Sequence, residues 1–166
     1  MKLSDGVEQA IHSVAMLSGL SPDGVLSAAA LAEFHGVSTS YLLKHLQALS
    51  GAGILQTVPG PRGGYRLARG ADEITLLDVV LAVEGREPAF RCKEIRQRGP
   101  NPLPQRYMTR PCQINAAMLR AERAYRAELA KTTVAEVLGE LAEQDMDGAV
   151  AARGCAFLEQ HERKSS

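Results

Sequence analysis

The sequence predicts a mainly α-helical fold with a small β-wing, in the form of a winged helix-turn-helix followed by a long helix. Apolar residues recur at helical spacing along most of the chain, and two short β-rich runs flank a turn rich in Gly and Pro. Hydrophobic residues make up 45% of the 166 residues but aromatic residues only 4%, without tryptophan. This composition suits helices packed by Leu, Val and Ala, in one compact domain or a small domain with an appendage.

The N-terminal part of the chain predicts a helix followed by a helix-turn-helix. The first helix follows Ser4 or Asp5, either of which is a good N-cap, and its apolar positions are Val7, Ala10, Ile11, Val14 and Leu17. Ser27 caps a short second helix, which Gly36 closes in the left-handed conformation that glycine tolerates. Ser38 opens a third helix, TSYLLKHLQALSGAG, with an apolar stripe of Leu42, Leu46 and Leu49. In a helix-turn-helix this last helix is the one that reads DNA.

A hairpin after the third helix predicts the wing. The runs ILQTV and GYRLA are joined by PGPRGG, which places Arg62 at the tip of the turn. From His35 to Ala71 the chain holds no Asp or Glu, whereas it holds Lys44, Arg62, Arg66 and Arg69. Because the net charge of the whole chain is zero, this local excess of positive charge is what favours contact with DNA phosphates.

The predicted reading surface has two parts. The N-terminal half of the third helix would enter the major groove, and Arg62 on the wing would reach the minor groove or a phosphate. The candidate DNA-binding residues are Ser38, Thr39, Ser40, Tyr41, Lys44, His45 and Arg62.

The whole chain divides into four parts. They are a winged helix-turn-helix domain (1–85), a cysteine-containing loop (86–111), dimerisation helices (112–144) and a C-terminal tail (145–166). The first part closes with a helix in ITLLDVVLAVEG, capped by Thr75. The loop carries four prolines between Cys92 and Cys112, and a connection of this length is usually functional or disordered. We expect the tail to be loosely ordered and at best weakly helical.

Three cysteines, Cys92, Cys112 and Cys155, favour metal or redox chemistry over structural disulfides. No stretch approaches the roughly 18 consecutive apolar residues of a membrane span. The opening MKLSDGVEQAIH lacks the basic start and apolar middle of a signal peptide, so we expect a cytoplasmic protein, in which structural disulfides are rare. Cys155 is interpreted as a small, partly buried hydrophobic residue or an idle thiol.

The order of these elements resembles the Rrf2 family of bacterial transcription regulators. The resemblance rests on the helix-turn-helix, the wing with GGYRL, the helix TLLDVVLAVEG, the cysteine loop and the TTVAEVL stretch, and covers roughly residues 1 to 144. It implies a homodimer whose long helices cross and whose winged domains bind a palindromic double-stranded DNA operator. In members that carry an iron-sulfur cluster, it implies a cluster between the dimerisation helix and the DNA-binding half.

The candidate cluster ligands differ from the common pattern of that family. Cluster-binding members commonly carry three closely spaced cysteines in the loop, whereas this chain has two, with Met108 where a further thiol could stand, so a three-cysteine site is excluded. Glu8 and His12 stand four residues apart on one face of the first helix. The opening MKLSDGVEQAIH and the loop FRCKEIRQRGP closely resemble a redox-sensing member. This resemblance implies a 2Fe-2S cluster with Glu8, His12, Cys92 and Cys112 as ligands, the cysteines from one subunit and the other two from its partner.

Other uses of the two loop cysteines stay open. They could form a reversible disulfide, which needs Cα atoms within roughly 7 Å. They could bind zinc together with Glu8 and His12, without a redox response. The same thiols could serve an electron carrier or adaptor that does not bind DNA, although this leaves the acid-free segment unexplained. An enzyme is not expected, because the sequence holds no phosphate-binding loop, nucleophile elbow or HExxH pair.

Overall fold

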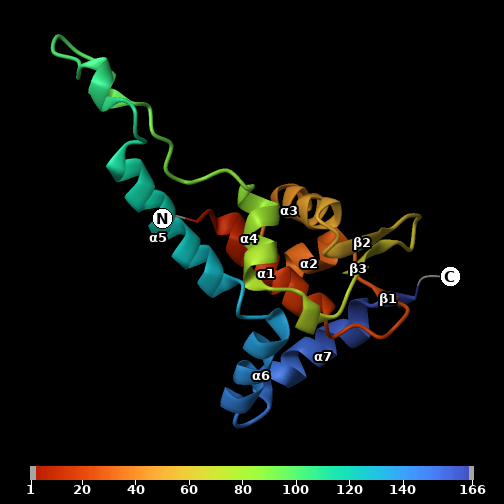
Figure 1. Cartoon of the computed structure of the whole chain (residues 1–166). Helices are drawn as coiled ribbons and strands as arrows, with labels where there is room; N and C mark the ends of the chain where they lie inside the picture. The colour runs from red at the N-terminus through yellow and green to blue at the C-terminus, as the bar shows by residue number, and fades with distance from the viewer. Residues whose placement is uncertain (1–2, 165–166) are drawn as a thin grey trace.

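The computed structural model describes residues 3–164 and shows a helical body from which one arm projects (Figure 1). The helices are α1 (Asp5–Leu17), α2 (Ala28–His35), α3 (Thr39–Gly51), α4 (Leu76–Glu84), α5 (Gln113–Leu129), α6 (Val134–Gln144) and α7 (Ala149–His161). The strands are β1 (Gly24–Val25), β2 (Leu55–Val58), β3 (Gly64–Leu67) and β4 (Arg163–Lys164), and the 3-10 turns are η1 (Ala71–Glu73), η2 (Ile95–Gln97) and η3 (Gln105–Tyr107). The predicted fold class is confirmed. Within residues 3–164, no helix is both long and apolar enough to cross a lipid bilayer.

The helix-turn-helix is built on a shared apolar core. Side chains from α2, α3 and the adjoining segments are fully buried there, namely Leu26, Leu31, Leu42, Leu46, Leu49 and Ile54. Ser27 caps α2 by accepting the N–H of Ala30 at 3.1 Å. Gly36 ends α2 with a φ of +66°, the left-handed conformation expected from the sequence. Both ends of the short second helix are therefore fixed by local sequence, and α3 is held by burial of its leucine stripe.

β2 and β3 form the antiparallel wing. Their register is Leu55↔Leu67, Gln56↔Arg66, Thr57↔Tyr65 and Val58↔Gly64. A bridge between Leu26 and Tyr65 joins the wing to the segment that follows β1. Glycine is required at position 64 because a Cβ there would collide with the carbonyl group of Leu26. The base of the wing is thus tied closely to the helical core.

α4 and α6 complete this winged module. Thr75 and Asp78 form a capping box at the start of α4, with the two hydrogen bonds at 3.0 and 3.1 Å. The carbonyl group of Ile74 accepts the N–H of Val134 at 2.9 Å, which joins the starts of α4 and α6. Val134 is buried in the core. α6 thus contributes to the core of its own chain, and the predicted role of residues 112–144 in dimerisation stays a prediction.

α5 and the cysteine loop form the projecting arm (Figure 1). Along α5, Glu122 is the single buried residue among those described. The large apolar side chains of Ile114 and Met118 are 66% and 44% exposed. A helix that exposes an apolar face in this way finds no packing partner for it within its own chain.

The prediction of a loosely ordered C-terminal tail is wrong. Residues Ala149–His161 form α7, and Arg163–Lys164 form β4, which pairs with β1. Leu158 of α7 is buried against the module, and Asp145 accepts two backbone N–H groups in the first turn of the helix at 2.9 and 3.1 Å. Tertiary packing and this capping order the segment, because an isolated helix of this length with a weak apolar pattern is marginal in water.

Candidate DNA-binding surface and metal-ligating residues

The N-terminal half of α3 lies on the surface of the module. Ser38 precedes the helix, and its hydroxyl group lies 3.0 Å from that of Ser40 rather than capping the helix. Thr39 and Lys44 are exposed, and Tyr41 is 41% exposed. This edge of α3 therefore presents hydroxyl groups and an ammonium group, which are suited to phosphate oxygens and base edges.

His45 occupies a different position from these residues. It is half-buried between α3 and α1, and its ring packs edge-on against Tyr41 with centroids 4.8 Å apart. Gly6 of α1 lies so close that a Cβ there would collide with the imidazole ring. Burial, followed by the charge of Lys44, lowers the pKa of His45, while Glu84 acts in the opposite direction. The structure gives His45 a packing position between two helices, whereas the sequence analysis placed it in the exposed reading surface.

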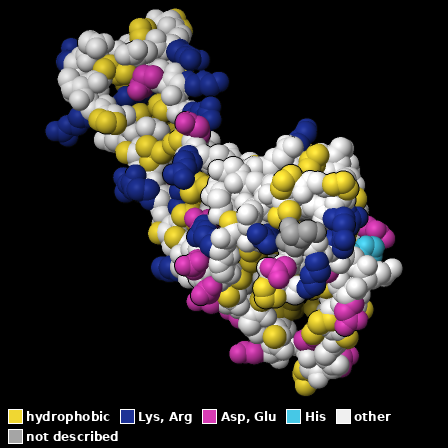
Figure 2. Space-filling model, turned by 90° about the vertical axis from the view of Figure 1, so that its right-hand side faces the viewer, with side chains coloured by type: hydrophobic (Ala, Val, Ile, Leu, Met, Phe, Trp, Pro, Cys, Tyr) yellow, Lys and Arg dark blue, Asp and Glu magenta, His cyan; other side chains and the backbone are white. Residues whose placement is uncertain are grey.

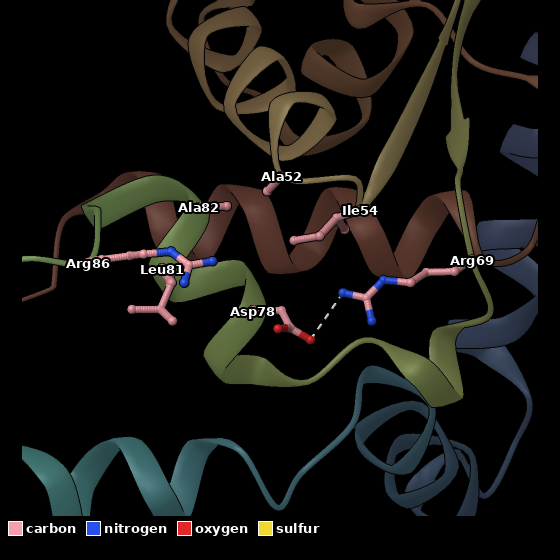
Figure 3. Close-up of a pocket in the computed structure, with 7 residues that line it drawn as sticks. All are labelled: Ala52, Ile54, Arg69, Asp78, Leu81, Ala82 and Arg86. Atoms are coloured by element: carbon pink, nitrogen blue, oxygen red, sulfur yellow. Dashed lines mark hydrogen bonds and ion pairs between the residues drawn. The ribbon is translucent and has the colours of Figure 1, made fainter.

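The three arginines of the wing region differ in their surroundings. Arg62 is exposed in the turn between the strands. Arg66 donates a hydrogen bond across the hairpin to Gln56 at 2.9 Å. Arg69 pairs with Asp78 of α4 at 3.2 Å, beside a cavity of about 90 Å³ between the end of α3 and α4 (Figure 3). The charge of Arg69 is thus compensated inside the module, and Arg62 carries the exposed charge of the turn.

Cys92 and Cys112 lie together where α5 begins. Cys112 is the N-cap residue of α5, and the backbone N–H groups of Asn115 and Ile114 lower its pKa. A hydrogen bond from the Cys92 thiol and the charge of nearby Arg96 act in the same direction. The lowered pKa favours the thiolate, which is the form of cysteine that binds metals and reacts with oxidants. By contrast, Cys155 is exposed on α7, so its interpretation as a partly buried residue is wrong.

Glu8 and His12 lie one turn apart on the exposed side of α1. With Leu3, Ser4, Val7 and Ile11 they line an open, mostly apolar cavity of about 300 Å³. Within residues 3–164 of one chain, no three His, Cys, Asp or Glu side chains are grouped closely enough to bind one metal ion. The structure therefore brings the two cysteines together but leaves Glu8 and His12 as a separate pair.

Two charged residues of α5 fix the start of the cysteine loop. Glu122 is buried, pairs with Arg126 at 2.6 Å and accepts the N–H of Ala89 at 3.1 Å. Arg126 donates to the carbonyl groups of Arg86 and Glu87, each at 3.1 Å. This attachment was not predicted from the sequence. The i,i+4 spacing of Glu122 and Arg126 signals an ion pair on one helix, but it contains no information about the loop backbone that the pair binds.

Together, the helix-turn-helix, the acid-free exposed edge of α3 and the hairpin with its exposed arginine define a winged helix-turn-helix protein. Residues 3–140 match the family model for Rrf2, which is described as an iron-dependent transcriptional regulator. The chain belongs to the Rrf2 family.

Individual relatives agree with this assignment over the N-terminal part of the chain. The putative HTH-type transcriptional regulator YwgB of Bacillus subtilis is 38% identical over 97 residues, which are 58% of this chain and 62% of that protein. The HTH-type transcriptional regulator IscR of Photorhabdus laumondii is 32% identical over 93 residues, 56% of this chain and 57% of that protein. The matching part thus spans less than two thirds of the length of these relatives.

Solved structures share the fold over most of the chain. CymR of B. subtilis, the global cysteine regulator, superposes with a TM-score of 0.63 and 21% identity, covering 84% of this chain and 98% of CymR. IscR of T. potens gives a TM-score of 0.63 at 21% identity, covering 88% of this chain and 92% of that one. At this level of identity the likeness concerns the fold alone.

Proposed function

We propose that this protein is a non-enzymatic, DNA-binding transcription regulator that binds a double-stranded operator as a homodimer. The observation that carries the proposal is the exposed edge of α3, which lies in a segment without acidic residues and is followed by an exposed arginine on the wing. Ser38, Thr39, Ser40, Tyr41 and Lys44 contact phosphates or base edges in the major groove, and Arg62 contacts a phosphate or the minor groove. His45 contributes by supporting α3 against α1 rather than by direct contact.

The dimer is supported by the exposed apolar face of α5. Ile114 and Met118 on this face need a partner to be removed from water, and a second copy of α5 offers the same face in a two-fold arrangement. The open apolar cavity on α1 is a second surface that a partner subunit could cover. A dimer also matches the symmetry of a palindromic operator.

We further propose that the dimer holds one 2Fe-2S cluster at each shared site, as in the redox sensor RsrR. The residues fit this group as two half-sites, since Cys92 and Cys112 are adjacent and Glu8 and His12 lie one turn apart beside an open cavity. Thiolate, imidazole and carboxylate groups are all known iron ligands. The cluster, when bound, accepts and releases an electron. The N–H groups at the start of α5 lower the pKa of Cys112, which favours the thiolate form that ligation requires.

A path from this site to the reading helix runs through α1. Glu8 and His12 belong to the same helix as Gly6, whose close contact with His45 joins α1 to α3. The start of α1 is also joined to α4, because Glu84 of α4 accepts the N–H and the hydroxyl group of Ser4, the N-cap residue of α1, at 2.9 and 2.5 Å. A shift of α1 therefore displaces α3, and a coupling of about 1 to 3 kcal/mol would change operator affinity roughly 5- to 150-fold.

The cluster proposal is tested by purifying the protein without oxygen and recording its visible spectrum with iron and sulfide analysis. We expect bands that bleach with dithionite and return in air, and a colourless protein from Cys112→Ala. Cys155→Ala is the matched control, because that thiol lies on α7 outside the site, and it should retain the bands. A wild-type protein that stays colourless after cluster reconstitution would reject the cluster.

The DNA proposal is tested by replacing Arg62. Arg62→Ala should weaken operator binding and reduce its salt dependence, because one phosphate contact is lost. Arg120→Ala, which removes an exposed arginine of α5, is the control and should leave binding unchanged. Equal binding by Arg62→Ala and wild type at moderate salt would reject the wing contact.

A second candidate is a cluster-free thiol switch, favoured by the adjacency of Cys92 and Cys112. In that case the protein purified without oxygen is colourless, and mild oxidation joins the two cysteines in a disulfide that peptide mapping detects. A zinc-bound form would also be colourless, but it would contain zinc and show no redox response.

A further inference from the structure

The folded chain continues past the region that matches the family model. The match ends at residue 140, whereas α7 covers Ala149–His161 and β4 covers Arg163–Lys164. Both elements lie against the winged module, and β4 lies on the same side of the molecule as the wing (Figure 1). This C-terminal extension thus adds contacts and charges to the module.

α7 is attached by an apolar and aromatic contact. Leu158 is 9% exposed and lies against Gly19, in the turn after α1. The Phe157 ring packs against Phe34 of α2 with centroids 4.8 Å apart, and the guanidinium group of Arg153 lies 4.2 Å from the centre of the Phe34 ring. Because α7 contacts both the turn after α1 and the helix α2, its C-terminal end has a defined position beside β1.

β4 is attached by backbone pairing and by a polar cluster. It pairs antiparallel with β1. Glu162, just before β4, accepts hydrogen bonds from the hydroxyl group of Ser21 and from the ammonium group of Lys164, the latter at 3.2 Å. Lys164 also donates to Ser21. The charge of Lys164 is therefore compensated by Glu162.

Arg163 has different surroundings from Lys164. It is exposed, and its guanidinium group donates to the carbonyl group of Pro61 in the wing turn at 3.4 Å, a long hydrogen bond. A guanidinium group carries five N–H donors, so this contact leaves most of them available to a further acceptor. Several Lys and Arg side chains are also exposed on the body at the face shown in Figure 2, interspersed with acidic and apolar ones, and this face is the side that carries the wing in Figure 1. The wing turn thus has one arginine of its own, Arg62, and is touched by a second from the end of the chain.

We propose that Arg163 contacts a DNA phosphate beside the wing, and that α7 and β4 hold it in that position. This inference rests on the proposed DNA-binding function and extends its surface to a residue outside the family match. Phosphate oxygens suit a guanidinium group because they can accept two of its N–H groups at once. Contacts of this kind orient a protein on the duplex and do not depend on base sequence.

The test compares Arg163→Gln with Lys164→Gln in the full chain, since each removes one positive charge from the same strand. Binding to a fluorescein-labelled duplex of random sequence is measured by anisotropy over a series of NaCl concentrations. Losing one phosphate contact lowers the slope of log affinity against log salt by about 0.9. We expect Arg163→Gln to bind about threefold to fivefold more weakly at low salt. Its salt slope should fall by about 0.9 for each subunit that contacts the duplex. Lys164→Gln should match the wild type.

Several outcomes distinguish this inference from the function on which it rests. A wild-type slope for Arg163→Gln, with binding still weakened by Arg62→Ala, overturns the role of Arg163 and leaves the DNA-binding function intact. Equal losses in Arg163→Gln and Lys164→Gln also overturn it, because they reflect general charge. Absence of salt-dependent binding by the wild type rejects the DNA-binding function itself. Arg163→Lys retains the charge and should keep the wild-type salt slope, but it should bind slightly more weakly because an ammonium group cannot donate the paired hydrogen bonds of a guanidinium group. Thermal unfolding of each variant identifies any loss of folding.

Discussion

In the winged module α3 fully buries Leu42, Leu46 and Leu49, whereas the longer α5 buries one described residue, the charged Glu122. The module is stabilised by its own core and by caps that its sequence encodes locally. The arm is attached to it by a few polar contacts, and Ile114 and Met118 of α5 are exposed. Comparison of the two regions indicates that the module is stabilised by contacts within its own chain, whereas the arm leaves Ile114 and Met118 without a packing partner in that chain.

The largest expected effect is on the core of the module. Leu46→Ala leaves a cavity in a fully buried site, and we expect the free energy of unfolding to fall by about 2 to 5 kcal/mol. Ile114→Ala on α5 is the matched control, because it removes a similar apolar group from an exposed site and should change this free energy by about 0.5 kcal/mol or less in the monomer. Urea unfolding followed by circular dichroism measures both. Similar losses in the two variants would contradict the division into a self-stabilised module and a dependent arm.

The next effect concerns the proposed association of two copies of the chain through α5. The double substitution Ile114→Asp and Met118→Asp places carboxylates on the apolar face of α5, and we expect the dimer dissociation constant to rise about 100-fold, or roughly 2.8 kcal/mol. Sedimentation equilibrium measures the change. The helical circular dichroism and the melting of the module should persist, since neither residue belongs to its core. A dimer of unchanged strength would assign the interface to another surface.

The part of the structure that sequence alone predicted is the part determined by local patterns. The caps at Ser27 and Thr75 and the left-handed Gly36 are each specified by a residue and its immediate neighbours. The leucine stripe of α3 likewise follows from helical spacing. These patterns were sufficient for the helix-turn-helix, the wing and the fold class.

The features that sequence reasoning missed depend on contacts between distant residues. α7 has a weak apolar pattern, and its order comes from Phe157 against Phe34 and from Leu158 in the core, more than a hundred positions away from their partners. Helical spacing alone does not show whether His45 of α3 faces solvent or a neighbouring helix. The close approach of Gly6 shows that the ring packs against α1. Among the candidate ligands, the pairing of Cys92 with Cys112 was predicted from the family resemblance and not from spacing, because it depends on the path of the loop. The site shared between subunits stays a prediction.

A smaller effect is expected where the arm joins the module. Glu122→Ala removes the acceptor for the N–H of Ala89 and the partner of Arg126. Because Arg126 is partly exposed to solvent, we expect these contacts together to contribute about 1.4 kcal/mol. We expect trypsin to cleave the arginine-rich loop about tenfold faster, which corresponds to about 1.4 kcal/mol of local opening. Glu122→Gln keeps acceptor oxygen but loses the charge, so its cleavage rate should lie between those of Glu122→Ala and wild type. Equal rates in all three proteins would mean that this pair does not order the loop.

The smallest effect is on the pH dependence of module stability and concerns the contact between α1 and α3. Burial beside Gly6, with the charge of Lys44, lowers the pKa of His45, whereas Glu84 partly opposes the shift. The unfolded chain therefore takes up a proton at His45 at higher pH than the folded chain does. The resulting stability is present above about pH 6.5 and is lost as the pH falls through the lower pKa of the folded state.

His45→Gln removes this contribution, so the free energy of unfolding should fall less steeply between pH 7 and pH 5 than in the wild type. Urea unfolding at a series of pH values measures the slope. Burial also lowers the pKa of His35, but this residue is present in both proteins, so its contribution cancels in the comparison. An unchanged slope in His45→Gln would mean that protonation of this ring does not disturb the α1–α3 contact, and α1 would then have to affect α3 through packing alone.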